Sequence, residues 1–245
     1  MSETKVKKSR LSAGKIVLLV VIVLIVVVAA AFMWYVGDYY HADADEYLVS
    51  SDTVSVMYVD DGVLFYGSGN DTALIFYPGA KVEYTAYAPI MVKLAEGGVD
   101  CFIIEMPFNL AFFGMNKAEN VMSEFVSYEN WYIGGHSLGG AMAASFASNH
   151  RDELCGLVLL ASYSTSDLGD LPTLSIYGSE DSVLNLESLE AGRQYSTDYT
   201  EICIEGGNHA GFGFYGDQSG DGTATISPEE QWKTTTSEIL SWVEG

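Results

Sequence analysis

The sequence is poor in basic residues, and the few that it has are unevenly placed. Only 11 of the 245 residues are lysine or arginine, and five of these lie within the first fifteen positions. Residues 37–245 carry 6 basic and 32 acidic side chains, a formal charge of −26. Because such a surface repels phosphate groups, it argues against nucleic acid as a partner and against highly anionic substrates.

Cysteine is rare as well, with only Cys101, Cys155 and Cys203. An odd number of thiols cannot be fully paired within one chain, so a disulfide framework is not indicated. Each cysteine lies in an apolar stretch typical of a strand, and none has the electropositive, exposed setting of a nucleophilic thiol. We therefore expect three buried, unreactive thiols.

Charge is absent from residues 16–36, "IVLLVVIVLIVVVAAAFMWYV". A helix of this length spans roughly 32 Å, enough to cross a bilayer core of about 30 Å. With the basic residues before the segment, the sequence predicts a cytoplasmic tail at 1–15, a transmembrane helix at 16–36 and an extracytoplasmic remainder. A signal peptide cleaved near residues 29–31 is the alternative, although the apolar run is long for that role.

Beyond this segment, residues 37–51 are expected to form an acidic stalk and residues 52–245 a globular domain. Two short alternating runs separated by Asp60-Asp61-Gly62 predict a hairpin at the start of the domain. Apolar strands then alternate with helical segments, which predicts a mostly parallel sheet with helices on both faces and an antiparallel N-terminal edge hairpin. The gaps between strands are too short for a large lid domain.

The pentapeptide Gly135-His136-Ser137-Leu138-Gly139 follows a predicted strand and opens a predicted helix. This strand–turn–helix setting is typical of a nucleophile elbow, which exposes a serine hydroxyl on a sharp turn. Ser137 is therefore the candidate nucleophile. A plain glycine-rich turn is the alternative.

A serine needs a base, and the sequence offers four histidines. His209 lies in a loop after the last strand, where it can meet Ser137 at the same edge of the sheet. Asp181 follows the preceding strand and is the candidate for orienting that histidine. Glu180 is its neighbour, and Asp167 and Asp170 are reserve candidates.

The oxyanion of a tetrahedral intermediate needs backbone donors. We expect one from Leu138, after the nucleophile, and one from Ala80 or Lys81, in the loop after an earlier strand. Phe108, Phe112 and Phe113 follow another strand and are candidates for lining a substrate pocket.

The stretch "DQSGDG" at 217–222 is similar to the start of a calcium-binding loop. Its third position is Ser219, and Pro228 stands where the loop needs a bidentate acid. We therefore interpret it as a surface turn and expect no metal site.

The motifs "FYPGAKV", "EMPFNLA", "GGHSLGG", "YGSEDSV" and "GGNHAGFG" occur in this order over about residues 60–245. Through them the sequence resembles the α/β-hydrolase superfamily, in particular small lidless bacterial members related to dienelactone hydrolase. The resemblance implies a triad of Ser137, Asp181 and His209 and ester hydrolysis through an acyl-enzyme, without a cofactor. Dienelactone hydrolase uses a cysteine nucleophile, which position 137 lacks, so lactone specificity is not implied.

The sequence thus predicts a membrane-anchored serine hydrolase, similar to carboxylesterases, that acts on small or exposed ester substrates. An envelope acyltransferase or thioesterase with the same triad is one alternative. A non-catalytic surface binding protein that keeps the fold is another, because fold alone does not determine function.

Overall fold

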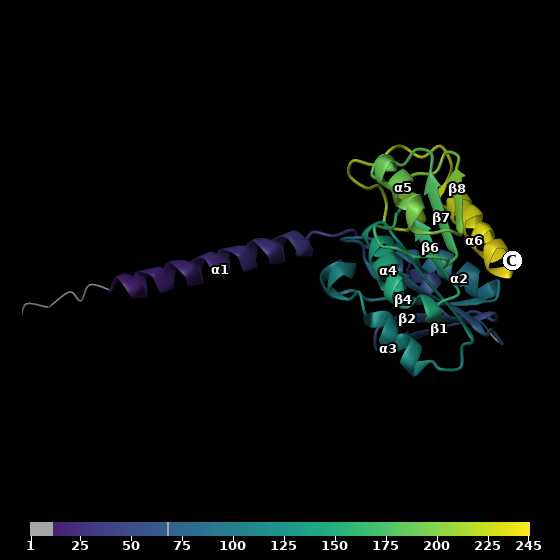
Figure 1. The fold of residues 1–245 in the computed structure, drawn as a ribbon, viewed down its shortest axis with the longest axis horizontal. Helices are drawn as coiled ribbons and strands as arrows, with labels where there is room; N and C mark the ends of the chain where they lie inside the picture. The colour runs from purple at the N-terminus through teal and green to yellow at the C-terminus, as the bar shows by residue number, and fades with distance from the viewer. Residues whose placement is uncertain (1–11, 68) are drawn as a thin grey trace, which may run out of the picture. The chain divides into compact units, whose positions relative to one another are not determined.

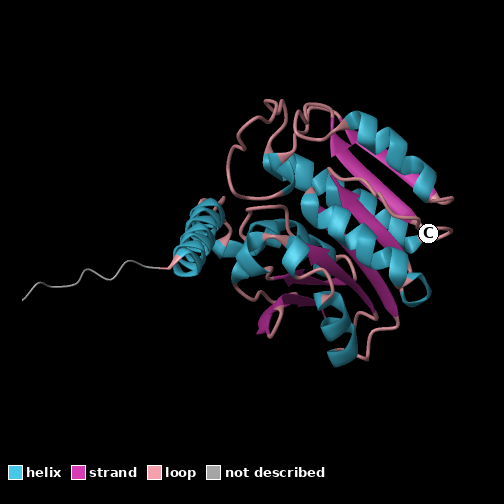
Figure 2. Cartoon of the chain, turned by 60° about the vertical axis from the view of Figure 1, so that its left-hand side comes forward, coloured by secondary structure: helices cyan, strands magenta, loops and turns pink. Residues whose placement is uncertain are grey.

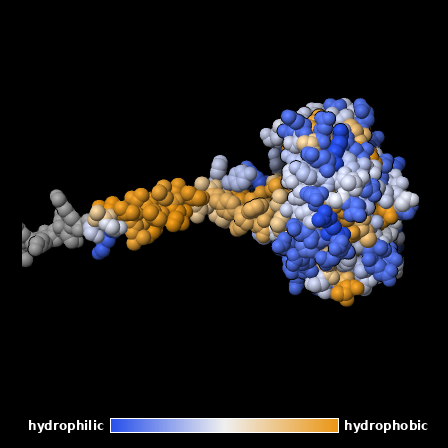
Figure 3. All heavy atoms as spheres, in the orientation of Figure 1, coloured by the Kyte–Doolittle hydropathy of each residue, from blue (hydrophilic) through white to orange (hydrophobic). Residues whose placement is uncertain are grey.

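The computed structural model describes residues 12–67 and 69–245, and the chain divides into two units, 1–38 and 39–245. The described part of the first unit contains one helix, α1 (Ala13–Gly37), which is long and apolar enough to cross a membrane. Figure 3 shows it coloured as hydrophobic along most of its length. Residues 1–11, with four of the five basic residues of the predicted tail, lie outside the described residues.

The second unit is built on one eight-stranded sheet with the order β1-β2-β4-β3-β5-β6-β7-β8 (Figures 1 and 2). β1 pairs antiparallel with β2 and β2 antiparallel with β4, whereas all later pairs are parallel. The strands are β1 (Val54–Val59), β2 (Gly62–Gly67), β3 (Thr72–Tyr77), β4 (Val99–Ile104), β5 (Asn130–His136), β6 (Gly156–Leu160), β7 (Thr173–Gly178) and β8 (Tyr199–Ile204). The predicted parallel sheet with an antiparallel edge hairpin is confirmed.

Helices cover both faces of the sheet, as predicted. On one face, Ile90 of α2 (Ala88–Glu96) and Trp232 of α6 (Pro228–Glu244) belong to the same buried cluster. On the other face, Val121 of α3 (Lys117–Glu124) and Phe146 of α4 (Leu138–Asn149) belong to a second cluster. The central strands β3, β4 and β6 are buried at every position, because they are covered on both faces.

The connection from β6 to β7, residues 161–172, contains no helix among the described residues. The remaining regular helix, α5 (Leu186–Gly192), follows β7 and begins with an N-cap hydrogen bond to the Asn185 side chain. Among the described residues, this connection therefore inserts no further domain at the carboxyl ends of the parallel strands, where function is expected in such sheets.

Residues 39–51, most of the predicted stalk, are part of the globular unit. The Tyr40 N–H donates to the Lys81 carbonyl at 2.7 Å, and the Asp43 N–H donates to the Phe214 carbonyl at 2.8 Å. The Tyr47 ring lies edge-on against Phe214 and packs with it on the domain. The rings of Tyr40 and Tyr47 pack on the domain, so these residues are not the separate stalk that their acidic composition had suggested.

The expectation of three buried cysteines is correct only for Cys101, in the centre of β4. Cys155 and Cys203 are exposed. Cys155 precedes β6, and Cys203 lies on β8, which is the last strand of the sheet and is only partly covered. An apolar run in sequence does not distinguish an edge strand from a central one.

Candidate active site

Ser137 lies at the turn between β5 and α4, with φ 54° and ψ −124°. A positive φ is rare for a residue with a side chain and stores strain that persists only where the surrounding structure holds it. The flanking glycines make this turn possible. A Cβ at Gly135 would lie 2.6 Å from the Gly139 backbone, and one at Gly139 would clash with the carbonyl oxygens of Tyr77 and Pro78.

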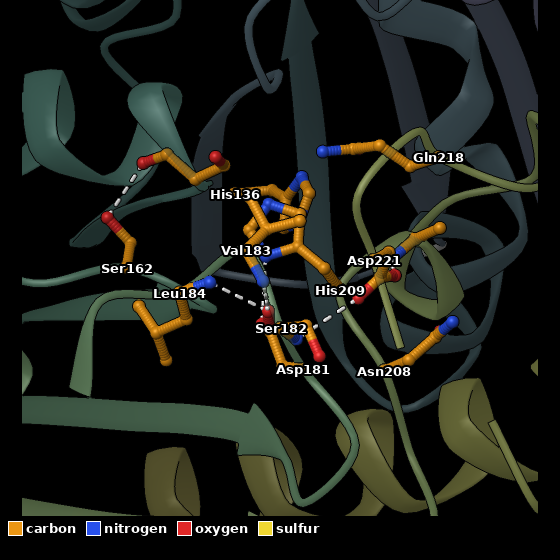
Figure 4. Close-up of polar contacts among 12 residues, drawn as sticks. His136, Ser162, Asp181, Ser182, Val183, Leu184, Asn208, His209, Gln218 and Asp221 are labelled. Carbon is orange, nitrogen blue, oxygen red and sulfur yellow. Dashed lines mark hydrogen bonds and ion pairs between the residues drawn. The ribbon is translucent and has the colours of Figure 1, made fainter. Parts of the chain in front are cut away.

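His209 and Asp181 point toward each other in the close-up of Figure 4. His209 Nδ1 donates to Asp181 Oδ2 at 2.8 Å, and both side chains are buried. The other carboxylate oxygen, Asp181 Oδ1, accepts the N–H groups of Val183 and Leu184 at 2.9 and 2.8 Å. Because a carboxylate only accepts, Nδ1 carries the imidazole proton, and Nε2 of the neutral ring is left as an acceptor.

Ser137 and His209 line the same pocket, which has a volume of about 260 Å³. Leu138, Ser162 and Val183 are among its other lining residues. Nε2 of His209 is buried and has no hydrogen-bond partner among the residues that the structure describes. His209, the candidate base, and Ser137 therefore line one cavity without a hydrogen bond between them, an arrangement common before substrate binds.

Ala80 and Lys81, the two predicted sources of the second oxyanion donor, follow Gly79 in the loop after β3. The N–H of Lys81 donates to the Asn109 carbonyl at 2.8 Å, so this amide is already paired. The N–H of Gly79 donates to the Tyr87 hydroxyl at 3.0 Å. The prediction of Lys81 as an oxyanion donor is therefore wrong, because its N–H is already used. Ala80 stays a candidate, together with Leu138 at the start of α4.

The three phenylalanines predicted for the pocket do not line the cavity that contains Ser137. Phe108, Phe112 and Phe113 are 46, 68 and 49% exposed. Phe112 and Phe113 line a separate surface hollow beside Lys117. The predicted pocket role is therefore corrected: the loop that carries them turns their rings outward.

His136 is buried beneath the site. Its Nδ1 lies 2.8 Å from the Tyr87 hydroxyl, and its ring centroid lies 4.5 Å from that of His209. Burial, and then the nearby His209 ring, hold the pKa of His136 well below its usual value. At neutral pH His136 is therefore uncharged, and it packs against the His209 ring without placing a positive charge next to it.

Two polar residues that the sequence analysis did not identify, Gln231 and Asp221, hold the loop of His209. Gln231 of α6 accepts the Asn208 N–H at 3.1 Å through Oε1 and donates to the Asn208 carbonyl at 2.8 Å through Nε2. Asp221 Oδ2 accepts the Ala210 N–H at 2.8 Å. These contacts clamp the residues on both sides of His209.

Of these residues, only Asp221 belongs to a motif noted in the sequence, and that motif suggested calcium binding rather than support of His209. This residue belongs to the stretch that is similar to a calcium loop, but its carboxylate binds backbone amides of the His209 loop and of Ser182. Among the described residues, no group of three or more His, Cys, Asp or Glu side chains could hold a metal ion.

A family model described as "Alpha/beta hydrolase family" matches residues 73–233. This match covers about two thirds of the chain and includes Ser137, Asp181 and His209. No curated protein has a sequence that matches this chain.

Solved structures share the fold at low sequence identity. An α/β hydrolase from a metagenome of lagoon sediments at Mar Chica, Morocco, is 15% identical, with a TM-score of 0.59 over 78% of this chain and 100% of that chain. Est1E from Butyrivibrio proteoclasticus is 14% identical, with a TM-score of 0.56 over 79% of this chain and 100% of that chain. A soluble variant of monoglyceride lipase from Saccharomyces cerevisiae is 11% identical, with a TM-score of 0.57 over 80% and 96%.

Proposed function

The chain belongs to the α/β hydrolase family, and from this premise we propose that it is a serine hydrolase that cleaves carboxylic esters through an acyl-enzyme on Ser137. The observation that carries the proposal is the pairing of two features in one pocket. Ser137 has the strained backbone of a nucleophile elbow, and His209, already bonded to Asp181, lines the same cavity.

In the first half of the reaction, Nε2 of His209 takes the proton of the Ser137 hydroxyl while Oγ attacks the ester carbonyl carbon. Asp181 keeps the proton on Nδ1 and stabilises the imidazolium that forms. The N–H groups of Leu138 and Ala80 are the proposed donors to the oxyanion. As the tetrahedral intermediate collapses, His209 gives its proton to the leaving alcohol, and the acyl group stays on Ser137.

In the second half, His209 removes a proton from water, and the resulting hydroxide attacks the acyl carbon. Collapse of this second intermediate releases the carboxylic acid and returns the proton from His209 to Ser137 Oγ. No redox or metal step enters this sequence. An acceptor alcohol in place of water would give acyl transfer with the same residues.

The substrate class follows from the size and charge of the site. A pocket of about 260 Å³ suits small acyl groups. The formal charge of −26 over residues 37–245 disfavours strongly anionic esters. We further propose that α1 anchors the protein in a membrane with residues 37–245 on the extracytoplasmic side, because the basic residues precede the apolar run.

The test of the chemistry is active-site labelling of the full chain with a fluorophosphonate, together with turnover of p-nitrophenyl esters of increasing chain length. We expect labelling that is lost in Ser137→Ala. Ser162→Ala is the matched control, since Ser162 is a second serine of the same pocket and should not be labelled. Labelling that survives Ser137→Ala would contradict the proposal, and labelling without ester turnover would favour acyl transfer.

Topology is tested separately by adding protease to intact cells. The proposed orientation predicts that the domain is degraded while residues 13–37 are protected by lipid. A fully protected domain would contradict it.

A further inference from the structure

An uncharged aromatic loop stands out on the acidic domain. Residues 106–116, "MPFNLAFFGMN", contain no charged side chain, whereas residues 37–245 as a whole carry −26. The loop forms two short helices, η3 (Pro107–Asn109) and η4 (Ala111–Phe113). The Phe113 ring packs edge to face against both Phe108 and Phe112, with ring centroids 5.6 and 5.5 Å apart. Each of the three side chains nevertheless stays about half exposed or more. We refer to residues 107–113 as the aromatic loop.

The chain enters the domain directly beside this loop. The Tyr40 N–H donates to the Lys81 carbonyl at 2.7 Å, and the Lys81 N–H donates to the Asn109 carbonyl at 2.8 Å. Three backbone segments, at Tyr40, Lys81 and Asn109, thus lie side by side. Glu83 completes the attachment by donating its N–H to the Tyr40 carbonyl at 2.9 Å.

The link from the apolar helix to this attachment is very short. α1 ends at Gly37, and only Asp38 and Tyr39 lie between it and Tyr40. Three fully extended residues reach at most about 11 Å. Two further steps between neighbouring backbones, at about 4.8 Å each, lead from Tyr40 to Asn109. Covalent and hydrogen-bonded links therefore allow Asn109, in the middle of the aromatic loop, to lie no more than roughly 20 Å from Gly37, whatever the angle of the link.

From this restriction we propose that the aromatic loop is a membrane-docking surface, with Phe108, Phe112 and Phe113 inserted into the lipid interface next to the proposed anchor. Phenylalanine is among the side chains that interfacial segments bury at the boundary between headgroups and acyl chains. Trp34 and Tyr35, at the end of α1, are of the two types enriched at membrane interfaces. The occupant is a bilayer rather than another protein, because the anchor keeps a bilayer within reach of the loop at all times. The absence of charge in the loop also avoids the cost of bringing carboxylates to lipid.

The inference rests on the proposed anchor and does not depend on hydrolysis at Ser137. It does have a consequence for the site. Lys81, whose amide the loop binds, is next to Ala80, the proposed oxyanion donor. Docking of the loop would therefore bring this rim of the site to the lipid surface.

The test measures the depth of the loop in the full chain reconstituted into phosphatidylcholine vesicles, which carry no net charge. Cys155→Ser and Cys203→Ser remove the two exposed thiols, and a nitroxide label is then placed on Phe112→Cys. The control carries the label on Val126→Cys. Val126 is also an exposed apolar residue, at 80%. It lies in the loop before β5, at the amino ends of the parallel strands, whereas the aromatic loop follows the carboxyl end of β4.

We expect the label at position 112 to collide mainly with oxygen, which concentrates in lipid, and the label at 126 to collide mainly with a water-soluble nickel chelate. Equal behaviour of the two labels would overturn the proposal. Shielding of position 112 that grows with the protein-to-lipid ratio would also overturn it, in favour of a second copy of the chain. Fluorophosphonate labelling of Ser137 on the same vesicles reports the proposed chemistry independently, so either proposal can fail alone.

Discussion

Replacing Asp181 with asparagine should separate the role of this carboxylate in catalysis from its role in folding. The two N–H groups of Val183 and Leu184 bind Oδ1 at 2.9 and 2.8 Å, and an asparagine Oδ1 can accept both. The asparagine amide would then face His209 Nδ1 with N–H groups. To avoid two opposed donors, the neutral imidazole must move its proton to Nε2.

A proton on Nε2 removes the acceptor that the Ser137 hydroxyl needs. The corresponding substitution in serine proteases lowers kcat by about 10⁴, or about 5.5 kcal/mol of transition-state stabilisation. We expect a loss of this order here. Stability should fall by only about 1.5–3 kcal/mol, the contribution of one hydrogen bond to a charged group.

The assay is kcat for a p-nitrophenyl ester, measured on the full chain, with a thermal melt to verify that the variant is folded. Glu180→Gln is the matched control, because it makes the same chemical change one residue earlier. Its side chain accepts a hydrogen bond from the Ser179 hydroxyl at 3.2 Å and none from His209. The reasoning is refuted if folded Asp181→Asn keeps more than roughly a tenth of the wild-type rate, or if Glu180→Gln loses as much.

Three further substitutions test how the site is supported. Gln231→Met should leave the N–H and C=O of Asn208 unpaired and destabilise the protein by about 1–3 kcal/mol in denaturant unfolding, with a parallel loss of kcat; an unchanged midpoint would contradict the clamp. Gly139→Ala should lower the free energy of unfolding by about 1–3 kcal/mol, because the added Cβ would clash with the backbone oxygens of Tyr77 and Pro78. Gly192→Ala should lower it less, because its Cβ would lie 3.1 Å from the nearest atom, the Ser164 carbonyl oxygen. His136→Asn should make the protein less acid-sensitive. The pKa of His136 is lowered in the fold, so its contribution to the free energy of unfolding is complete above the unfolded pKa of about 6.5. This contribution decreases as the pH is lowered, by about 1.4 kcal/mol at pH 5.5. Melting curves at pH 7.5 and 5.5 would show a smaller decrease for the variant than for the wild type.

Local patterns in the sequence were sufficient to predict the sheet and the elbow. Alternation and apolar runs are produced by the burial of single strands, and these predicted the strands and their mostly parallel arrangement. Gly135 and Gly139 are required by close contacts within the turn at Ser137 and with the end of the adjacent strand. The turn could therefore be recognised from the spacing of glycines in a stretch of five residues. Ser137, Asp181 and His209 each follow a predicted strand, and this placement predicted that all three lie at one edge of the sheet.

Contacts between distant segments could not be predicted in the same way. Gln231 and Asn208 are 23 residues apart, and Tyr87 and His136 are 49 apart, and no periodicity links the members of either pair. The Lys81 amide could be recognised as occupied only when the Asn109 carbonyl was seen beside it. The same holds for the outward phenylalanines and for the packing of residues 39–51.

The sequence by itself thus determined which segments become strands and helices, and which serine stands on a strained turn, because these depend on burial and backbone sterics over a few residues. The tertiary structure decided which acid meets His209, which amides stay available for an oxyanion and which side of the domain carries exposed aromatic rings. Those outcomes depend on strand order and on loops that meet across the sheet edge. Hydrogen bonds there are satisfied between whichever groups the packing brings within about 3 Å.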